Sequence, residues 1–312
     1  MPLHPAAQKM IEDAQASDRP NAHLLPVPEA RRNFEDDFGA LAKPEVEQVV
    51  DIEVPSRDGE TLPARLYLPS TGSALPLTLY FHGGGWLLGS VDSHDTATRK
   101  LALASGAAVL SVGYRRGPEA RFPVAVHDAY DAVVWAATPG NLSGVDPSRV
   151  AVAGDSAGGN LAASVAIQAR DSGAVDLLHL LLAYPVTTCD LSIGIDPEYE
   201  GIMLFRDELQ WHQDNYLSSP DEASDPRVDI LGAKLHGLPP ATVVLAECDP
   251  IRPQGELLAE ALRAAGVEVL VHQTPGMVHG FFGLDEVFPP AAEAMETAGQ
   301  RLAAAFSRTP EE

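Results

Sequence analysis

Short runs of apolar residues alternate along the chain with longer stretches whose apolar positions recur at helical spacing. Apolar runs of this length predict strands that are buried on both faces, and the alternation predicts a mostly parallel sheet with helices on both sides. The predicted strands of this region are Leu75–Phe81, Ala107–Val112, Val150–Ala153, Leu177–Tyr184, Thr242–Ala246 and Val267–His272. The predicted helices are His94–Ala104, Val124–Ala137, Ala157–Arg170, Gln254–Ala264 and Ala291–Phe306.

Two segments depart from this alternation. Residues 1–45 are polar and contain several prolines, and they predict two short helices, Ala6–Ala16 and Ala30–Phe38. Residues 190–227 interrupt the pattern between two strands and predict one or two further short helices. An insertion of this kind is a common way for an α/β core to cover its site. We therefore divide the chain into an N-terminal helical arm (1–45), a first core part (46–189), an insertion (190–227) and a second core part (228–312).

The first core part opens with two runs that predict strands, Val46–Val54 and Leu62–Leu68. Asp58 and Gly59 lie between them and form a turn signal. The three features together predict an antiparallel hairpin at the start of the sheet.

Composition and charge narrow the classes of function. The chain has 312 residues, of which 45% are hydrophobic, and a net charge of −23. Nucleic-acid binding is disfavoured because phosphate contacts need a basic face. No apolar run approaches the roughly 18 residues of a membrane span. The first residues hold no apolar signal region, so we expect a cytoplasmic protein.

The cysteine pattern gives no sign of a metal site. Cys189 and Cys248 are the two cysteines of the chain, too few for a disulfide framework. No Cys-x-x-Cys or His-x-x-x-His pair is present, so neither a zinc site nor any other metal is predicted. Both cysteines are expected to be buried thiols.

The strongest chemical signal is Gly154-Asp155-Ser156-Ala157-Gly158, a Gly-x-Ser-x-Gly motif between a predicted strand and a predicted helix. This is the context in which the motif forms a sharp turn that exposes a nucleophilic serine. Small residues must flank the serine, or the chain cannot turn so tightly. At the start of the helix, the N–H group of Ala157 can donate to a developing oxyanion. Ser156 is therefore the predicted nucleophile.

A triple glycine follows the strand Leu75–Phe81, in the run His82-Gly83-Gly84-Gly85-Trp86. Glycine amides in such a loop can point into a cleft, and Gly83 and Gly84 are expected to share the oxyanion with Ala157. No Lys-Ser or Lys-Thr pair follows, so a phosphate-binding loop is not supported. His82 precedes the serine, the wrong order for a hydrolase base, and is expected to orient the loop.

An acid and a base must follow the serine in this type of triad. Asp249 lies where the strand Thr242–Ala246 ends, with Glu247 as a competing acid. His279 lies in a glycine-flanked loop after the last predicted strand, whereas His272 belongs to that strand and is expected to be structural. Asp249 and His279 complete the predicted catalytic set with Ser156.

From about Val46 onward the sequence resembles the bacterial hormone-sensitive-lipase-like esterases, the family IV carboxylesterases of the α/β-hydrolase fold. The motifs that carry the resemblance are His82–Trp86, Tyr114-Arg115 with Pro118-Glu119, Gly154–Asn160, Asp249-Pro250 and His279–Phe281. The resemblance implies a mostly parallel eight-stranded sheet with helices on both faces and a small helical cap, formed by the arm and the insertion. It also implies Ser156, Asp249 and His279 as the triad, and Gly83, Gly84 and Ala157 as the oxyanion hole.

The activity implied by the resemblance is hydrolysis of short-to-medium acyl esters, with no cofactor and a small-molecule ester as substrate. A homodimer is a further expectation, because members often pair. Amidases, deacetylases and lactonases use the same triad, and a non-catalytic receptor on this fold is the alternative outside enzymes.

Two positions depart from the family pattern. Pro253 stands where an acidic residue is common, and is expected at the start of the next helix. Arg116-Gly117 replaces an apolar pair, so the charge of Arg116 is expected to reach solvent or a carboxylate.

An apolar pocket for the acyl or alcohol group is expected near these residues. Ordinary core packing is the alternative for each of its candidates. The candidates are Leu87, Leu88, Met203, Leu204, Trp211, Phe281 and Phe282.

Overall fold

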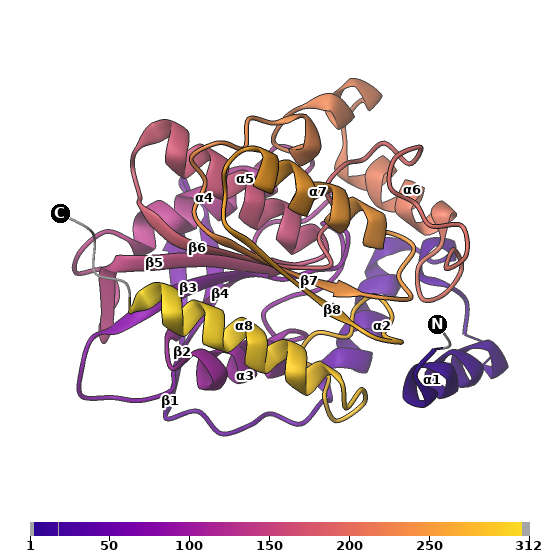
Figure 1. Ribbon diagram of the computed structural model, residues 1–312, viewed down its shortest axis with the longest axis horizontal. Helices are drawn as coiled ribbons and strands as arrows, with labels where there is room; N and C mark the ends of the chain where they lie inside the picture. Colours follow the sequence, from indigo (N-terminus) through magenta and orange to yellow (C-terminus); the bar gives the residue numbers. More distant parts are fainter. Residues whose placement is uncertain (1–2, 18, 308–312) are drawn as a thin grey trace.

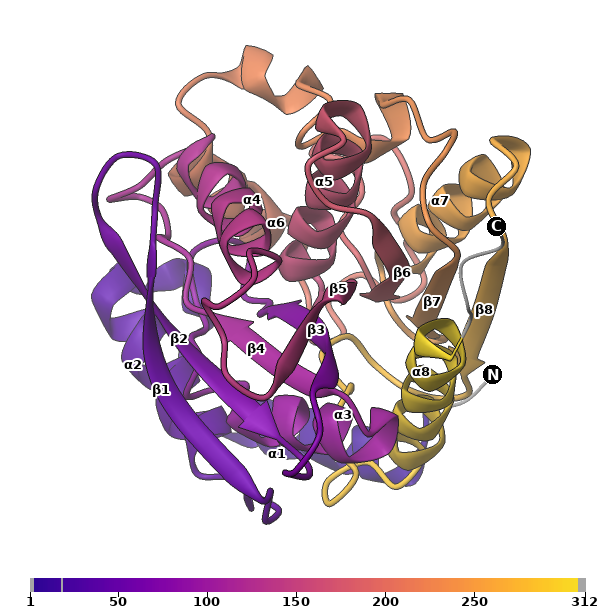
Figure 2. The same ribbon diagram turned by 90° about the vertical axis from the view of Figure 1, so that its left-hand side faces the viewer.

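The computed structural model describes residues 3–17 and 19–307, and within them an eight-stranded sheet runs through the molecule in the order β1-β2-β4-β3-β5-β6-β7-β8 (Figures 1 and 2). β1 pairs antiparallel with β2, and β2 pairs antiparallel with β4. Every later pair is parallel. The strands are β1 (Gln48–Pro55), β2 (Thr61–Leu68), β3 (Leu75–Phe81), β4 (Ala108–Val112), β5 (Val145–Asp155), β6 (Leu177–Ala183), β7 (Ala241–Ala246) and β8 (Val269–Thr274). The predicted opening hairpin and mostly parallel sheet are confirmed.

Helices cover both faces of the sheet. Figure 2 shows α4 (Val124–Ala136), α5 (Ala157–Ser172) and α7 (Arg252–Ala264) on one face, with α3 (Asp95–Ser105) and α8 (Ala291–Phe306) on the other. Successive residues of the central strands point to opposite faces, as pleating requires. Leu79 therefore packs in the core beneath α4 and α5, and Tyr80 packs in the core beneath α3 and α8.

The bounds of β5 and β8 differ most from those expected. β5 begins at Val145, before the apolar run. The hydrophobic pattern missed this first part because several of its residues are polar, and two of them, Arg149 and Asp146, form an ion pair at 2.7 Å. β8 begins at Val269 and continues to Thr274. It lies at the edge of the sheet, where half-buried side chains make the end of a strand hard to read from hydrophobicity.

The arm and the insertion lie side by side at the end of the sheet toward which β7 and β8 point (Figure 1). The arm holds α1 (Pro5–Ala16), the short 3₁₀ turn η1 (Ala22–Leu24) and α2 (Val27–Gly39). The insertion holds α6 (Arg206–Tyr216) and η2 (Pro220–Ser224); a last turn, η3 (Ile230–Gly232), follows it. The carboxyl ends of parallel strands form sites in open α/β sheets, so both segments are placed to cover one.

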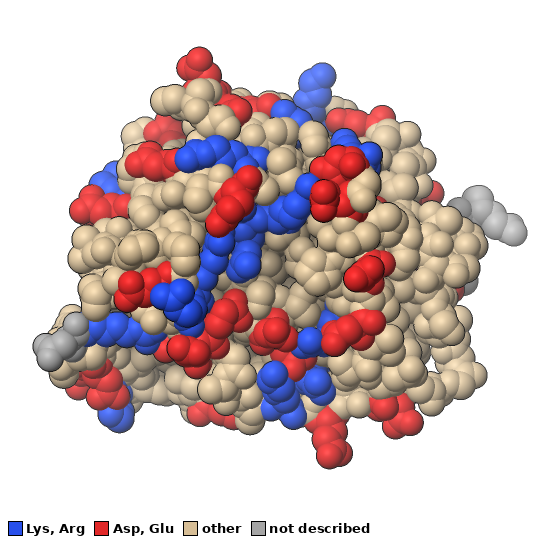
Figure 3. Space-filling view, turned by 180° about the vertical axis from the view of Figure 1, so that it is seen from behind, with Lys and Arg blue, Asp and Glu red and all other residues tan. Residues whose placement is uncertain are grey.

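Charged side chains of both signs share the surface. Figure 3 shows a band of Lys and Arg across one face, with Asp and Glu beside it. Within the residues that the structure describes, no helix is long and apolar enough to cross a membrane, and no group of His, Cys, Asp and Glu side chains is arranged to hold a metal ion. Cys189 and Cys248 are buried free thiols.

Candidate active site

Ser156 occupies the tight turn between β5 and α5. Its φ of 53° places it in the left-handed region, which non-glycine residues rarely adopt. Side chains at Gly154 or Gly158 would close this turn: an added Cβ on Gly158 would collide with the carbonyl oxygen of Phe81. The backbone is held by Ser156 N–H, which donates to the Ala183 carbonyl at 2.8 Å. The predicted strand–turn–helix context of the serine is confirmed.

His279 lies between Ser156 and Asp249. Its Nε2 is 2.9 Å from Ser156 Oγ, and its Nδ1 is 2.7 Å from Asp249 Oδ2. Asp249 is fully buried, and its other carboxylate oxygen accepts from the Ile251 N–H at 2.9 Å. The three side chains come from the ends of β5, β7 and β8, so the fold assembles them at one edge of the sheet.

The environment of His279 favours its charged form. Burial lowers the pKa of the imidazole, but the negative charge of Asp249 and its hydrogen bond raise it by more, and the pKa lies above its ordinary value of 6.5. Asp155 and Glu208 act in the same direction as Asp249. A base with this pKa holds a proton well once the serine has released it.

The competing candidates have other partners. The Glu247 carboxylate accepts from the Gly276 N–H at 2.8 Å and so holds the loop that carries His279. His272 Nδ1 is 3.3 Å from the hydroxyl of Thr297, on α8, which agrees with the structural role expected for it. Asp249 is therefore the acid in contact with the imidazole.

The contacts of the triple-glycine loop contradict one of the predicted oxyanion donors, Gly83. The N–H of Gly83 donates to Asp155 Oδ1 at 3.0 Å and also lies 3.3 Å from His94 Nε2. It is therefore not free to meet a substrate. Across the described part of the chain, the N–H groups of Gly84, Gly85 and Ala157 donate to no protein acceptor. The sequence cannot distinguish three consecutive glycines, so the predicted pair of loop donors, Gly83 and Gly84, lies one residue before the pair with free N–H groups, Gly84 and Gly85.

His82 supports the backbone of this loop. Its ring is buried, stacks on Tyr114 with 4.2 Å between ring centres, and places Nδ1 2.8 Å from the Gly83 carbonyl. Burial, with the nearby His94, lowers the pKa of His82 to about 3, so the ring is neutral. The Tyr114 hydroxyl donates to the His82 carbonyl at 2.8 Å. These contacts match the orienting role that the sequence predicts.

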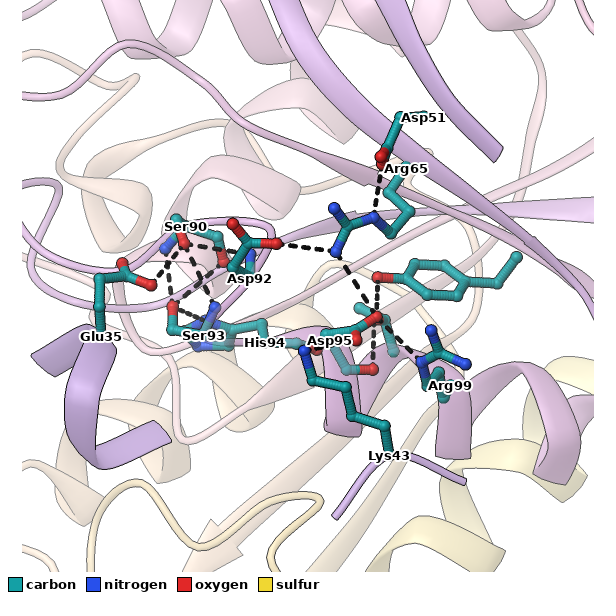
Figure 4. Close-up of polar contacts among 12 residues, drawn as sticks. Glu35, Lys43, Asp51, Arg65, Ser90, Asp92, Ser93, His94, Asp95 and Arg99 are labelled. Atoms are coloured by element: carbon teal, nitrogen blue, oxygen red, sulfur yellow. Dashed lines mark hydrogen bonds and ion pairs between the residues drawn. The ribbon is translucent and has the colours of Figure 1, made fainter. Parts of the chain in front are cut away.

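Polar contacts tie the far end of the same loop to the arm and to the outer strands (Figure 4). The Ser90 hydroxyl donates to Glu35 of α2 at 2.8 Å, and the Arg65 guanidinium pairs with Asp92 at 2.8 Å. Asp95, at the start of α3, accepts from the Tyr67 hydroxyl at 2.6 Å. The loop is therefore tied to two other elements, α2 through Glu35 and β2 through Arg65, and α3, which follows the loop, is tied to β2 through Asp95.

A cavity of about 460 Å³ opens above the serine. Ser156 and His279 lie in its wall with Gly84 and Gly85, and the rest of the wall comes largely from the arm and the insertion. A cavity of this size, mostly apolar with a few convergent polar groups, is typical of a small-molecule site.

The comparisons with known proteins agree with this geometry. The family model described as alpha/beta hydrolase fold matches residues 78–283 of the chain. The chain belongs to this family. It is 38% identical over 285 residues to ethyl acetate hydrolase of Pseudomonas putida, covering 88% of each chain. It is 43% identical over 255 residues to a carboxylesterase of Mycobacterium tuberculosis, covering 79% of each.

Solved structures give the same assignment. A hyperthermophilic esterase from the archaeon Pyrobaculum calidifontis superposes with a TM-score of 0.89 at 37% identity, and the match covers 98% of this chain and 100% of that one. Together with the arrangement of Ser156, His279 and Asp249, these relatives establish a serine carboxylic-ester hydrolase of the hormone-sensitive-lipase-like type.

The structure divides the expected pocket residues of the esterase into two groups. Leu88, Met203, Leu204 and Phe282 line the cavity. Leu87, Trp211 and Phe281 do not, which corrects the prediction for these three.

Each of the three packs elsewhere. Leu87 is fully buried against Ala30 of the arm, and Trp211 packs against the same small cluster. Phe281 lies in the core beneath α8, with its ring centre 5.6 Å from that of Tyr184. Neighbouring residues in a turn or helix face different ways, and composition alone does not tell which of them meets the cavity.

Both departures from the family pattern are accommodated. Pro253 lies in the first turn of α7, as expected. Among the residues that the structure describes, Arg116 pairs with no carboxylate: its guanidinium donates to the Gly89 carbonyl, beside the oxyanion loop. The backbone of that loop takes the place of the carboxylate, and because the Arg116 side chain is only half-buried, the other expected environment, solvent, still fits.

Asp155 is the residue next to the nucleophile that the sequence did not single out. Its buried carboxylate accepts from the Tyr80 hydroxyl at 2.7 Å and from the Gly83 N–H. Burial raises its pKa, but the charge and hydrogen bond of His94 outweigh this, so the pKa lies below its ordinary value. An ionised Asp155 therefore connects the serine turn to the oxyanion loop. Its only sequence signal was its place inside the serine motif.

Proposed function

We propose that the esterase acts on small esters with short-to-medium acyl chains, with Ser156 as nucleophile, His279 as base and Asp249 as the acid that orients it. The observation that carries the proposal is the pair of short contacts at His279, 2.9 Å to Ser156 Oγ and 2.7 Å to Asp249. In the first step Ser156 Oγ attacks the ester carbonyl carbon while His279 Nε2 takes the hydroxyl proton. Asp249 holds the imidazole in the required tautomer and stabilises its charged form.

The negative charge that develops on the carbonyl oxygen is stabilised by the N–H groups of Gly84, Gly85 and Ala157. This set replaces Gly83 by Gly85, because the Gly83 amide already donates to Asp155. Collapse of the intermediate breaks the carbon–oxygen bond to the alcohol, which leaves with the proton from His279. Water then attacks the acyl-serine, with His279 again as base, and releases the acid.

The size of the substrate follows from the cavity, which has a volume of about 460 Å³ and holds Leu88, Met203 and Phe282 in its wall. We infer that the arm and the insertion act together as a cap that limits the length of the acyl chain. The name of the Pseudomonas putida relative, ethyl acetate hydrolase, agrees with a preference for small esters. A cytoplasmic location and a homodimer stay predictions.

A panel of para-nitrophenyl esters tests the proposed substrate class. We expect kcat/KM to be high for acetate, butyrate and octanoate and to fall by about tenfold or more for dodecanoate, whose chain exceeds the cavity. An anilide and a lactone of matched acyl size serve as controls for amidase and lactonase activity. A kcat/KM that is higher for either control than for the ester of the same acyl group would contradict the proposal.

A further inference from the structure

Glu208 places a carboxyl group in the wall of the ester cavity. It lies in the first turn of α6, and it lines the same cavity as Ser156 and His279. Its side chain is 15% exposed. Apart from its contribution to the raised pKa of His279, the proposed mechanism gives this group no role in ester cleavage, and it is placed to meet a bound substrate.

The carboxyl group of Glu208 has no strong cationic partner. Among the described residues, no Lys or Arg side chain lies within 4.0 Å of it, and the basic atom that does is His212 Nε2 at 3.9 Å. Burial lowers the pKa of His212 to about 3, with His279 and His23 acting in the same direction, so that ring is neutral. The arginine that lines the cavity, Arg19, pairs with Asp37 at 2.7 Å instead.

This environment makes the charged form of Glu208 costly. Burial raises the pKa of the carboxyl group to about 7, while His279 and the backbone N–H of Phe205 act in the opposite direction. Near neutral pH the group is therefore divided between its two forms. A cation bound beside it would relieve the cost of the buried charge.

The cavity that Glu208 lines also has aromatic side chains in its wall. Phe34 from the arm, Phe205 from the insertion and Phe282 from the loop after β8 all line the cavity. Aromatic faces attract ammonium groups, most strongly where water is excluded. The cavity thus combines an unpaired carboxyl group with aromatic walls, which is the chemistry that recognises organic ammonium ions.

We propose that Glu208 is an anionic subsite that binds an ammonium group of the substrate, so that esters carrying a quaternary or protonated amine are preferred. The inference rests on the proposed ester hydrolysis, and it adds the substrate class. The ammonium group lies on one side of the scissile bond, in either the alcohol or the acyl part, and matched probes distinguish the two.

Two pairs of isosteric esters test the subsite. In the first pair the alcohol part differs: acetylcholine is compared with dimethylbutyl acetate, in which a carbon replaces the charged nitrogen. In the second pair the acyl part differs: the para-nitrophenyl ester of trimethylammoniobutyrate is compared with that of its uncharged carbon isostere. The readout is the ratio of kcat/KM for the charged ester to that for the neutral one, which cancels changes that affect both.

Glu208→Gln keeps the size of the side chain and an acceptor for the Phe205 N–H but removes the charge. We expect it to lower the charged-to-neutral ratio by about tenfold in one of the two pairs. Glu208→Leu, which also removes the acceptor, should lower the same ratio by as much. Asp207→Asn is the matched control, since it removes an exposed charge from the neighbouring position of α6 and should leave both ratios within about twofold.

The outcomes separate the subsite from the esterase itself. Ratios that stay within about twofold in Glu208→Gln, or that fall equally in Asp207→Asn, would overturn the subsite even though esters are still hydrolysed. A wild-type protein that hydrolyses no ester of either pair would instead overturn the proposed function. If both Glu208 variants fail to fold, inhibition of the wild type by tetramethylammonium chloride beyond that by sodium chloride is the deciding measurement, and its absence overturns the subsite.

Discussion

Replacing Ser156 by alanine is expected to lower kcat for a short-chain aryl ester by about 10⁵- to 10⁶-fold. The variant keeps the cavity and the oxyanion donors but has no oxygen to form the acyl-enzyme. Since Ser156 Oγ and His279 Nε2 are 2.9 Å apart, the loss should be almost as large as removal of the whole triad. Steady-state kinetics on para-nitrophenyl butyrate would measure it, with circular dichroism to confirm the fold.

Ser164→Ala is the control for this variant, because Ser164 lies on the helix that Ser156 begins, α5, and is buried outside the cavity. We expect its activity to stay close to that of the wild type. Near wild-type activity in Ser156→Ala would show that another group attacks the ester.

Asp249→Asn is expected to lower kcat by about 10³- to 10⁴-fold. An asparagine amide offers a donor where the imidazole Nδ1–H needs an acceptor, so the ring is no longer held in the tautomer that accepts the serine proton. The charge of Asp249 also raises the pKa of His279. The fall of kcat/KM on the acid side, which follows protonation of the base, should therefore move to lower pH in the variant.

Glu247→Gln is the matched control for Asp249→Asn, since it removes the neighbouring carboxylate at the end of the same strand. The amide oxygen of the substituted side chain can still accept from the Gly276 N–H, so we expect a loss of less than about tenfold. If Glu247→Gln lost as much activity as Asp249→Asn, the assignment of the acid would be wrong.

The sequence was sufficient for the parts of the structure that depend on long patterns. Apolar runs such as Leu75–Phe81 are buried on both faces, and their alternation with helices predicted the parallel sheet. The serine motif identified its own turn because only glycine fits at Gly154 and Gly158. Chain order and strand ends then led to Asp249 and His279.

The sequence could not predict features that depend on the direction in which a single amide or side chain points. Gly83, Gly84 and Gly85 are chemically identical, and only the contact between the Gly83 amide and Asp155 separates them. Leu87 and Leu88 are likewise adjacent and apolar, yet one packs against the arm and the other lines the cavity.

The sequence did not identify Glu208 as a cavity residue for a related reason. An acid in the first turn of a helix is common, because it faces the positive end of the helix dipole. Nothing in the sequence showed that this one points into the cavity.

The central claim is that Ser156 is the nucleophile that forms the acyl-enzyme, and labelling with a fluorophosphonate tests it most directly. Such a reagent reacts with a serine that is activated by a neighbouring base and aligned with an oxyanion hole. Peptide mapping by mass spectrometry should find one adduct per chain, on Ser156, formed in step with the loss of ester hydrolysis. Complete inactivation with the adduct on another residue, or full activity with Ser156 labelled, would contradict the account.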